Sequence, residues 1–443
     1  MGRGYRSPII AVLLACAQFA SPACHAQQQP KLSGNARAQV SNILRDAHDE
    51  VKKHYYDPKF QGLDWDARYR EYSAQLANIQ TMGDGFRIVA AFLEGLKDSH
   101  TFFEPPQRVS RTDYGYRLAM VGNSCFIIQV RPNSDAESKL HIGDQVVGLN
   151  GYRVDREDFH DILYFLNILA PQVSVKLDLL SPAGELRQVV VNATVTAPKR
   201  VLDISGGSNG NDYYDEVRRR EGEDRATRTR VVEIGDATIW KIQQFDLSSD
   251  EIDKGFAIAR KHKTLIFDLR GNPGGYVGAL EYMVGILFDH DIKISDRVGR
   301  KDYKPIVAKR GGKPFDGKLI VLVDARSASA SELLARVVQL EHRGTVIGDR
   351  TSGAVMEASF IVDSQGTETR IFYGFSVTDA NLIMSDGKSL EKTGVVPDEL
   401  LLPTGSDLAA GRDPVLAHAA ELAGVKLDPV AAGKMFPFQW APL

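Results

Sequence analysis

The chain has 443 residues, of which 43% are apolar and 25% are charged, the composition of an ordinary soluble globular protein. This length predicts roughly two to four domains and allows a large core. Its 54 basic and 57 acidic side chains give a formal charge of −3. That balance argues against the strongly basic class of nucleic-acid-binding proteins, so we expect no nucleic-acid partner.

Residues 1–26 have the pattern of a signal peptide. Arg3 and Arg6 form a basic start, an apolar stretch runs from Pro8 to Phe19, and Ala26 is a small residue suited to cleavage. The apolar stretch is shorter than the ~20 residues that a membrane-spanning helix needs. The sequence therefore predicts a periplasmic or secreted protein without a membrane span.

The positions of the cysteines allow a second interpretation of the N-terminus. They also argue against a fold that is stabilised by disulfide bonds. Leu13-Leu14-Ala15 before Cys16 is also typical of a lipoprotein, which would carry a lipid anchor at Cys16. Cleavage after Ala26 would remove Cys16 and Cys24 and leave Cys125 alone. A single cysteine forms neither an intramolecular disulfide nor a thiolate metal cluster.

Residues 27–110 are expected to form an N-terminal helical domain. Helices are predicted near its start and over 66–80 and 85–97, because apolar residues recur there at helical spacing. The helical pattern stops at Asp98-Ser99-His100-Thr101 and is followed by Pro105-Pro106, which ends helices. The first helix is indicated by Val40, Ile43, Leu44, Ala47 and Val51.

Residues 111–197 change to short β-type runs and predict a β-rich domain. Asn150-Gly151 predicts a tight turn between two strands, and residues 198–230, rich in glycine, serine and charge, predict a linker or mobile loop. The expected strands are Cys125–Val130, Gln145–Leu149, Val173–Leu180 and Leu186–Val195, with a helix near Glu157–Leu169.

Residues 231–443 predict a mixed α/β core that ends in a helix over 413–422. Thr264–Leu269 and Lys318–Val323 read as buried strands, and each is followed by a loop and an apolar helix. This βαβ rhythm implies right-handed crossovers. The fold class expected for the chain is therefore a multi-domain α/β protein with a helical domain, a β-rich domain and this core.

The first cluster that could take part in catalysis is Ser327-Ala328-Ser329-Ala330-Ser331-Glu332. It lies between the strand at 318–323 and the helix expected over Leu333–His342. A serine at a strand-to-helix turn exposes its hydroxyl, and the free amides of the helix can stabilise a developing oxyanion. The alternative is that these serines only cap the helix.

The second cluster is Asp268-Leu269-Arg270-Gly271-Asn272-Pro273-Gly274-Gly275, which follows a strand and opens a helix. Its glycines suit close approach of the backbone to a ligand. A nucleotide-binding loop is a poor alternative, because the glycine spacing is wrong, Pro273 interrupts it and no Gly-Lys-Ser/Thr follows. A tight turn without further function is the remaining alternative.

Together these clusters resemble the C-terminal processing (tail-specific) serine peptidases, whose pattern is Asp-Leu-Arg-x-Asn-x-Gly-Gly and then Ser-Ala-Ser-Ala-Ser-Glu. The resemblance implies that Ser329 is the nucleophile and that the amides of Gly274 and Ala330 form the oxyanion hole. That family also carries a PDZ domain, which residues 138–151 resemble in their Gly-Asp and Asn-Gly passages. A peptide or unfolded protein is then the expected partner, held by strand addition.

The chain departs from that family where the general base is expected. The family has Thr-x-Gly-Lys-Gly, whereas this chain reads Thr351-Ser352-Gly353-Ala354-Val355. Ala354 therefore stands where the family has its lysine. A serine hydroxyl is a weak nucleophile unless a base removes its proton, so another base is needed.

The related tricorn-type peptidases, which this chain also resembles, place a Ser-His pair before the PDZ segment. The resemblance implies that His100 is the base, with Ser99 or Glu391 as its orienting partner; Glu341 is a weaker candidate acid. His100 could instead be a structural residue at a helix C-terminus, and Glu391 an exposed loop acid.

The sequence thus predicts an exported serine endopeptidase that forms an acyl-enzyme on Ser329. The histidines lack the His-Glu-x-x-His pattern, so we expect neither a catalytic metal nor another cofactor. The alternative is an inactive pseudo-peptidase in which Ala354 marks the lost base and the PDZ-like domain binds peptide tails as an adaptor.

Overall fold

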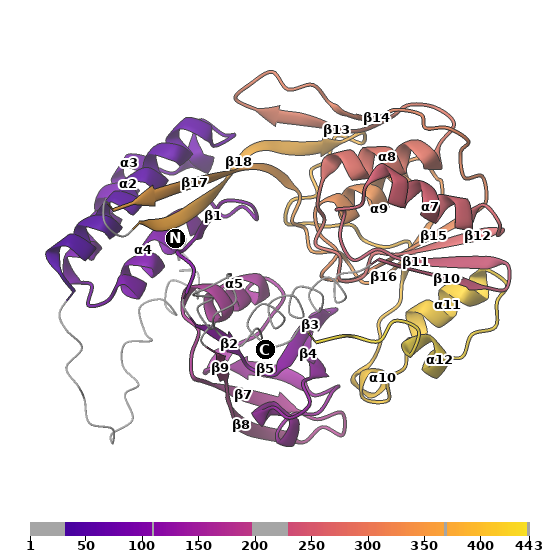
Figure 1. The fold of residues 1–443 in the computed structure, drawn as a ribbon, viewed down its shortest axis with the longest axis horizontal. Coiled ribbons are helices and arrows are strands. Elements are labelled where there is room, and N and C mark those ends of the chain that lie inside the picture. Colours follow the sequence, from indigo (N-terminus) through magenta and orange to yellow (C-terminus); the bar gives the residue numbers. More distant parts are fainter. Residues whose placement is uncertain (1–31, 109, 197–228, 367–369, 441–443) are drawn as a thin grey trace, which may run out of the picture.

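The computed structural model describes residues 32–108, 110–196, 229–366 and 370–440 (Figure 1). The predicted signal peptide, the alternative lipid anchor at Cys16 and residues 198–228 of the predicted linker lie outside these ranges. Within them, no helix combines the length and apolar character needed to cross a bilayer.

Three helices form the N-terminal part, as the apolar spacing predicts. The second ends earlier than expected and continues as a short 3-10 turn. The third begins earlier, because the Thr81 hydroxyl accepts from the Asp84 amide while the Asp84 carboxylate accepts from the Thr81 amide. The elements are α2 (Gly34–His54), α3 (Trp65–Gln75) and α4 (Met82–Glu94), with 3-10 turns at Phe60–Gly62 and Leu76–Asn78.

A five-stranded sheet that the sequence analysis missed joins these helices to the core. Its long central strand, β18, pairs with β1, β17 and β13 (Figure 1). The Tyr56 amide donates to the Thr378 carbonyl of β18 at 2.9 Å, and the Phe103 and Phe375 rings pack with centroids 5.7 Å apart. The strands are β1 (Phe102–Glu104), β13 (Ile292–Gly299), β14 (Ile306–Ala308), β17 (Met356–Gln365) and β18 (Ile371–Met384).

The next part, which we call the β domain (residues 111–196), contains the predicted strands. Asn150 and Gly151 both have positive φ, +51° and +86°, as the predicted tight turn between β5 and β6 requires. The expected strand over Leu186–Val195 is divided in two, because β8 pairs with β7 whereas β9 pairs with β2. Burial raises the pKa of the free Cys125 thiol to about 12.

The main sheet of the β domain has the order β3-β4-β5-β7-β8, with β6 on β5. The expected helix near Glu157–Leu169 begins at Phe159 and ends in a π-helical turn. The elements are β2 (Arg111–Asp113), β3 (Tyr116–Val121), β4 (Ser124–Val130), β5 (Gln145–Leu149), β6 (Tyr152–Arg153), α5 (Phe159–Tyr164), the turn Phe165–Leu169, β7 (Ser174–Leu180), β8 (Leu186–Asn192) and β9 (Thr194–Thr196).

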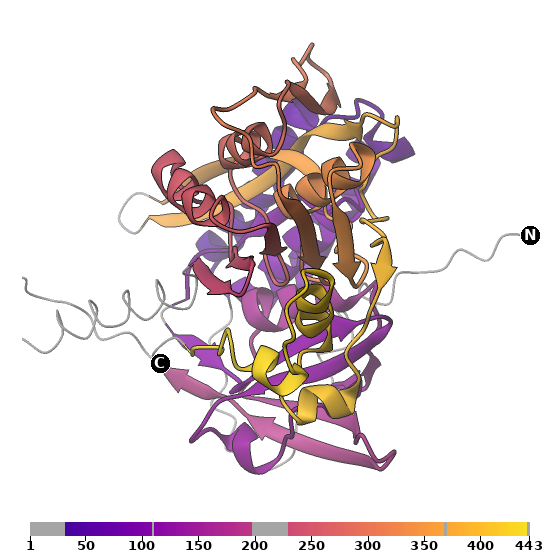
Figure 2. The same cartoon turned by 90° about the vertical axis from the view of Figure 1, so that its right-hand side faces the viewer.

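The core is a six-stranded sheet of order β10-β11-β12-β15-β16-β19, parallel except for β10. In Figure 2 it stands above the β domain. The predicted strands at 264–269 and 318–323 are β12 and β15, which lie side by side. The strands are β10 (Arg230–Ile234), β11 (Ala237–Lys241), β12 (Thr264–Asp268), β15 (Lys318–Val323), β16 (Thr345–Gly348) and β19 (Glu399–Leu400).

Helices cover both faces of this sheet (Figure 1). Val321 and Phe267 pack toward α7–α9, whereas Ile320 and Ile266 pack toward α11 and α12. Because β12 and β15 are parallel, the loops that follow them meet at one edge of the sheet, where both sequence clusters lie. The helices are α7 (Ser249–Ala259), α8 (Val277–Leu287), α9 (Ala330–Leu340), α10 (Gly405–Ala409), α11 (Pro414–Leu422) and α12 (Pro429–Gly433).

Candidate active site

Ser329 is the N-cap of α9, at the turn between β15 and the helix. Its φ of +52° is uncommon for a residue with a side chain and marks local strain. The turn is held from the backbone, because the Ser329 amide donates to the Ala354 carbonyl and to the Glu332 carboxylate, both at 3.0 Å. The strained turn thus sets the direction in which the Ser329 hydroxyl leaves the sheet edge.

The three serines of the first cluster do not share one role. The buried Ser327 hydroxyl donates to the Leu269 carbonyl at 2.9 Å, and the buried Ser331 hydroxyl donates to the Asn272 carbonyl at 3.0 Å. The outer serines therefore fasten the serine turn to the glycine-rich loop. Ser329, between them, is only partly buried.

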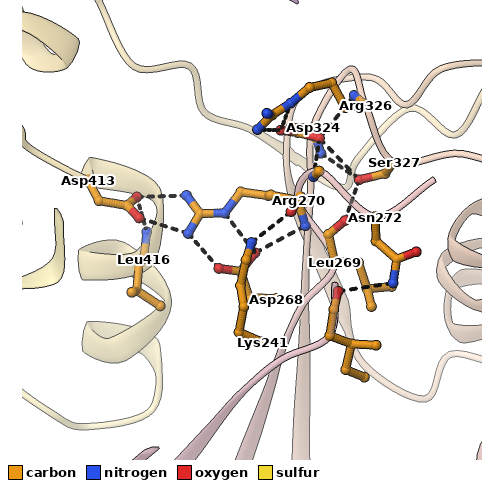
Figure 3. A network of polar contacts seen from close by, with 12 residues as sticks. Lys241, Asp268, Leu269, Arg270, Asn272, Asp324, Arg326, Ser327, Asp413 and Leu416 are labelled. Carbon is orange, nitrogen blue, oxygen red and sulfur yellow. Dashed lines mark hydrogen bonds and ion pairs between the residues drawn. The ribbon is translucent and has the colours of Figure 1, made fainter. Parts of the chain in front are cut away.

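The glycine-rich loop is anchored by an ion-pair network at the end of β12 (Figure 3). The Arg270 guanidinium lies 2.8 Å from the Asp268 carboxylate and 2.7 Å from the Asp413 carboxylate of the α11 cap, and Lys241 lies 3.1 Å from Asp268. Burial alone would raise the pKa of Asp268, but Arg270 and Lys241 hold it well below its usual range. The charged residues of this motif therefore fix the loop in place.

Gly274 brings this loop against the nucleophile. Its φ is +103°, and a Cβ at this position would lie 2.7 Å from Ser329 Cβ and 3.1 Å from the Ala330 nitrogen. Only glycine fits such an approach. The Gly274 amide donates to Asn272 Oδ1 at 2.8 Å, whereas the Ala330 amide makes no hydrogen bond to any described residue. Of the two expected oxyanion donors, the Ala330 amide thus has no acceptor among the described residues, whereas the Gly274 amide already donates to Asn272.

Glu332 lies beneath the serine turn with 0% exposure. Its carboxylate accepts from the Thr351 hydroxyl at 2.6 Å, the Gly353 amide at 2.8 Å, and the Ala354 and Ser329 amides at 3.0 Å each. Burial raises the pKa of Glu332 to about 7, although these donors oppose the shift. Glu332 thereby joins the nucleophile turn to the segment in which the family lysine is missing. In the sequence, Glu332 is recognisable only as the last residue of the serine-rich motif.

The structure brings Ser99, His100 and Glu391 into one hydrogen-bonded chain. The Ser99 hydroxyl lies 2.7 Å from His100 Nδ1 and donates to Glu391 Oε2 at 2.8 Å, while the Ser99 amide donates to Glu391 Oε1 at 2.8 Å. Burial lowers the pKa of His100 and raises that of Glu391. Ser99 is therefore inserted between the imidazole and the carboxylate, with the carboxylate also holding its backbone.

Asp98, which the sequence analysis did not single out, fixes the turn that carries His100. Its Oδ1 accepts from the His100 amide at 3.0 Å, the Thr101 amide at 2.8 Å and the Thr378 hydroxyl at 2.6 Å. Thr378 belongs to β18, so the central strand of the five-stranded sheet positions the histidine. An aspartate that precedes a turn by two or three residues is a signal for such capping.

The segment Ala354-Val355 contacts both the hydrogen-bonded chain that contains His100 and the turn that carries Ser329. The Val355 amide donates to Glu391 at 2.9 Å, and the neighbouring Ala354 carbonyl accepts from the Ser329 amide at 3.0 Å. No hydrogen bond joins the His100 ring to the Ser329 hydroxyl, although both residues are described. Glu341, the weaker candidate acid, lies at the opposite end of α9 from Ser329.

The β domain is tied to the same region of the core. Arg156 pairs with Asp349 at 3.1 Å and also donates to the Thr351 carbonyl at 3.3 Å, and the Gly122 amide donates to Asp349 at 2.8 Å. Thr351 is one of the donors to Glu332. A contiguous set of polar contacts therefore runs from the β domain to the nucleophile turn.

Comparison with known proteins identifies the core. Residues 237–401 match the model of peptidase family S41. The core of this chain is an S41 peptidase domain. Residues 36–93 match the tricorn protease C1 domain, which covers much of the helical part. Among described residues, no three His, Cys, Asp or Glu side chains are grouped so that they could hold a metal ion.

Other known proteins are similar to this chain over a longer range. Carboxyl-terminal-processing peptidase 3 of Arabidopsis thaliana is 22% identical over 81% of this chain and 68% of its own length. A tricorn protease homolog of Streptomyces coelicolor is 25% identical over 86% of this chain but only 32% of its own length. The crystal structure of mature CPAF shares the fold, with a TM-score of 0.63 at 14% identity over 85% of this chain and 94% of that one.

Proposed function

We propose that this S41 protein is an exported serine endopeptidase in which Ser329 is the nucleophile and His100 the general base. The observation that carries the proposal is the hydrogen-bonded chain Glu391–Ser99–His100. It supplies an oriented histidine in a chain that has Ala354 at the position of the family lysine. One shared segment, Ala354-Val355, contacts both this chain and the Ser329 amide, which supports their acting together.

The hydrogen bonds of Ser99 select the tautomer of neutral His100 that a base requires. The Ser99 hydroxyl has one proton, and an ionised Glu391 can only accept it. Ser99 must then accept from His100 Nδ1–H, so that in the neutral imidazole Nε2 is the unprotonated nitrogen and can take a proton. Because burial lowers the pKa of His100, the ring should remain a base below the pH at which an exposed histidine becomes charged.

The proposed reaction is acyl transfer. The Ser329 hydroxyl attacks the scissile carbonyl while its proton passes to His100 Nε2, and the Ala330 amide donates to the oxyanion. The peptide C–N bond breaks when His100 returns the proton to the leaving amine. Water then hydrolyses the ester with His100 again as base. For Gly274 to serve as second oxyanion donor, its amide must first leave Asn272.

The substrate class follows from the β domain and from the relatives. We propose that residues 111–197 are a PDZ-like domain that binds a peptide or an unfolded protein by strand addition. The relatives named for carboxyl-terminal processing favour cleavage near protein C-termini. The predicted signal peptide would place this activity in the periplasm or outside the cell. In the proposed domain plan, residues 27–110 carry the base and 231–443 the nucleophile.

A fluorophosphonate probe tests the proposal against the adaptor alternative. An activated Ser329 should be labelled, and His100→Ala should reduce both labelling and peptide hydrolysis at least about 100-fold. Ser329→Ala should abolish both. His290→Ala, which changes an exposed histidine remote in sequence from either cluster, is the control and should match the unaltered protein. Equal labelling of the His100→Ala variant would remove His100 from the mechanism, and no labelling of any form would favour the adaptor.

A further inference from the structure

The β domain contains a groove that the catalytic proposal does not use. It has a volume of about 330 Å³, and it is lined on one side by β3 and on the other by α5 and the turn after it. Tyr116, Arg117 and Leu118 come from β3, and Leu163 and Leu166 from the helical side. The charged lining residues are Arg111, Asp113 and Arg117. A strand beside a helix, with apolar residues and two arginines in the wall, suits an extended peptide with large side chains.

The C-terminal segment of the same chain already lies at this groove. Trp440 is one of the lining residues, and the Arg131 guanidinium stands 4.4 Å from the centre of its ring. The Arg117 guanidinium lies 5.8 Å from the Trp440 ring and 5.5 Å from the Phe438 ring. The two rings meet edge to face at 5.1 Å. Cation–π contacts of this kind favour aromatic side chains at the site.

The contacts of Arg117 indicate a site for a ligand rather than a packed core. Arg117 makes no hydrogen bond or ion pair within the described part of the chain. Its nearest opposite charge, Asp113, pairs instead with Arg131 at 2.8 Å. A guanidinium that makes no hydrogen bond or ion pair within the chain can stack on an aromatic side chain or pair with a carboxylate of a bound peptide.

The aromatic segment Phe438–Trp440 is held by few contacts, so it can dissociate from the groove. Met435 and Phe436 pack against the C-terminal helices, and the Pro437 carbonyl accepts from Arg230 at 3.2 Å. Beyond this point Phe438 is 43% exposed. The segment is therefore tethered next to the groove, but it contributes no fully buried side chain there.

We propose that the groove between β3 and α5 binds peptides with aromatic side chains, and that Phe438–Trp440, stacked on Arg117 at its edge, acts as a built-in competitor. A tethered segment acts at an effective concentration of about millimolar, so an incoming peptide binds only if it displaces the segment. The inference builds on the proposed peptide-binding role of the β domain but not on catalysis by Ser329. It assigns the C-terminal segment a regulatory function, because substrate access depends on its release.

Competition in trans tests the inference. A fluorescein-labelled peptide with the sequence of residues 434–440 is titrated with the full chain carrying Ser329→Ala, which prevents cleavage, and with the same chain carrying also Phe438→Ala and Trp440→Ala. Loss of the tethered rings should lower the dissociation constant at least about ten-fold. Gln439→Ala, which changes the exposed residue between the rings, is the matched control and should leave the affinity unaltered.

A further variant and a second peptide test whether binding takes place in this groove. Arg117→Ala in the chain without the two rings should weaken peptide binding, and a peptide with alanine in place of Phe438 and Trp440 should not bind. Equal affinity of both chains for the aromatic peptide, or binding to neither, overturns the inference. Hydrolysis is measured separately with Ser329 intact, so a failure of the peptidase proposal leaves the competition result standing, and the converse also holds.

Discussion

Replacing Glu332 by glutamine would test the buried acid beneath the nucleophile. Its carboxylate accepts four hydrogen bonds, from the amides of Ser329, Gly353 and Ala354 and from the Thr351 hydroxyl. A glutamine has one acceptor oxygen, so its amide nitrogen must face two of these donors. Since the Thr351 hydroxyl can rotate, the least costly orientation leaves the Gly353 N–H without an acceptor, at about 1–3 kcal/mol.

The dependence of stability on pH separates the charge of Glu332 from its hydrogen bonds. Burial raises the pKa of Glu332 from its ordinary 4.5 to about 7 in the folded protein. Because the folded pKa is the higher one, the stabilisation is fully present below pH 4.5 and is lost as the pH rises through about 7. Between pH 5 and pH 8 the loss amounts to about 2–3 kcal/mol. Glutamine does not titrate, so the variant should gain this amount relative to the unaltered protein over the same range.

Urea unfolding of both proteins at pH 5 and pH 8 measures this difference, because the other titrating groups cancel between them. Infrared spectroscopy gives a direct check: the stretching band of a protonated buried carboxyl should disappear with an apparent pKa near 7 and be absent from Glu332→Gln. Glu341→Gln, at the exposed far end of the same helix, is the control. If both proteins lost the same free energy between the two pH values, Glu332 would not titrate there and the reasoning would be wrong.

Three further substitutions have defined outcomes. Gly274→Ala places a Cβ 2.7 Å from Ser329 Cβ, so peptide hydrolysis should fall at least about 100-fold with unchanged circular dichroism, and near-normal turnover would contradict the close approach. Ser99→Ala removes the hydroxyl between imidazole and carboxylate and should lower kcat about 10–100-fold, with KM nearly constant; an effect on KM alone would argue against a positioning role. Arg156→Ala leaves the buried Asp349 unpaired and should cost about 3–5 kcal/mol in thermal unfolding, largely restored in the double variant with Asp349→Leu.

The sequence predicted those parts of the site that are formed by residues close together in the chain. The turn at Ser329 could be located because a strand that is apolar after Lys318, a serine cluster and a helix follow one another within a short stretch. The five-stranded sheet could not, because it is assembled from segments far apart in the chain, from Phe102–Glu104 to Ile371–Met384, and no local pattern shows which of them pair. The acceptor role of Glu332 was also hidden, since three of its four donors come from Thr351, Gly353 and Ala354, about twenty residues further along the chain.

Residues brought together only by pairing of distant segments were equally out of reach. The sequence resemblance named Ser99, His100 and Glu391, but the pattern of residues alone gave no reason for Glu391 to meet Ser99 across the fold. Asp98 and Thr378 fix that meeting through one short hydrogen bond between a turn and a strand. Such a contact has no local signature, because each residue alone reads as an ordinary turn or strand residue.

The anchoring of His100 by β18 has a consequence for when the enzyme becomes active. Asp98 and Thr101 are held by Thr378, and β1 pairs with β18 directly after the histidine turn. A chain emerging from synthesis or export presents the histidine segment long before β18 exists to receive it. In the proposed mechanism the nascent chain therefore carries no oriented base and cannot cut itself or its neighbours. Peptidase activity begins only when nearly the whole chain has been delivered and folded, which confines it to the compartment where folding is completed.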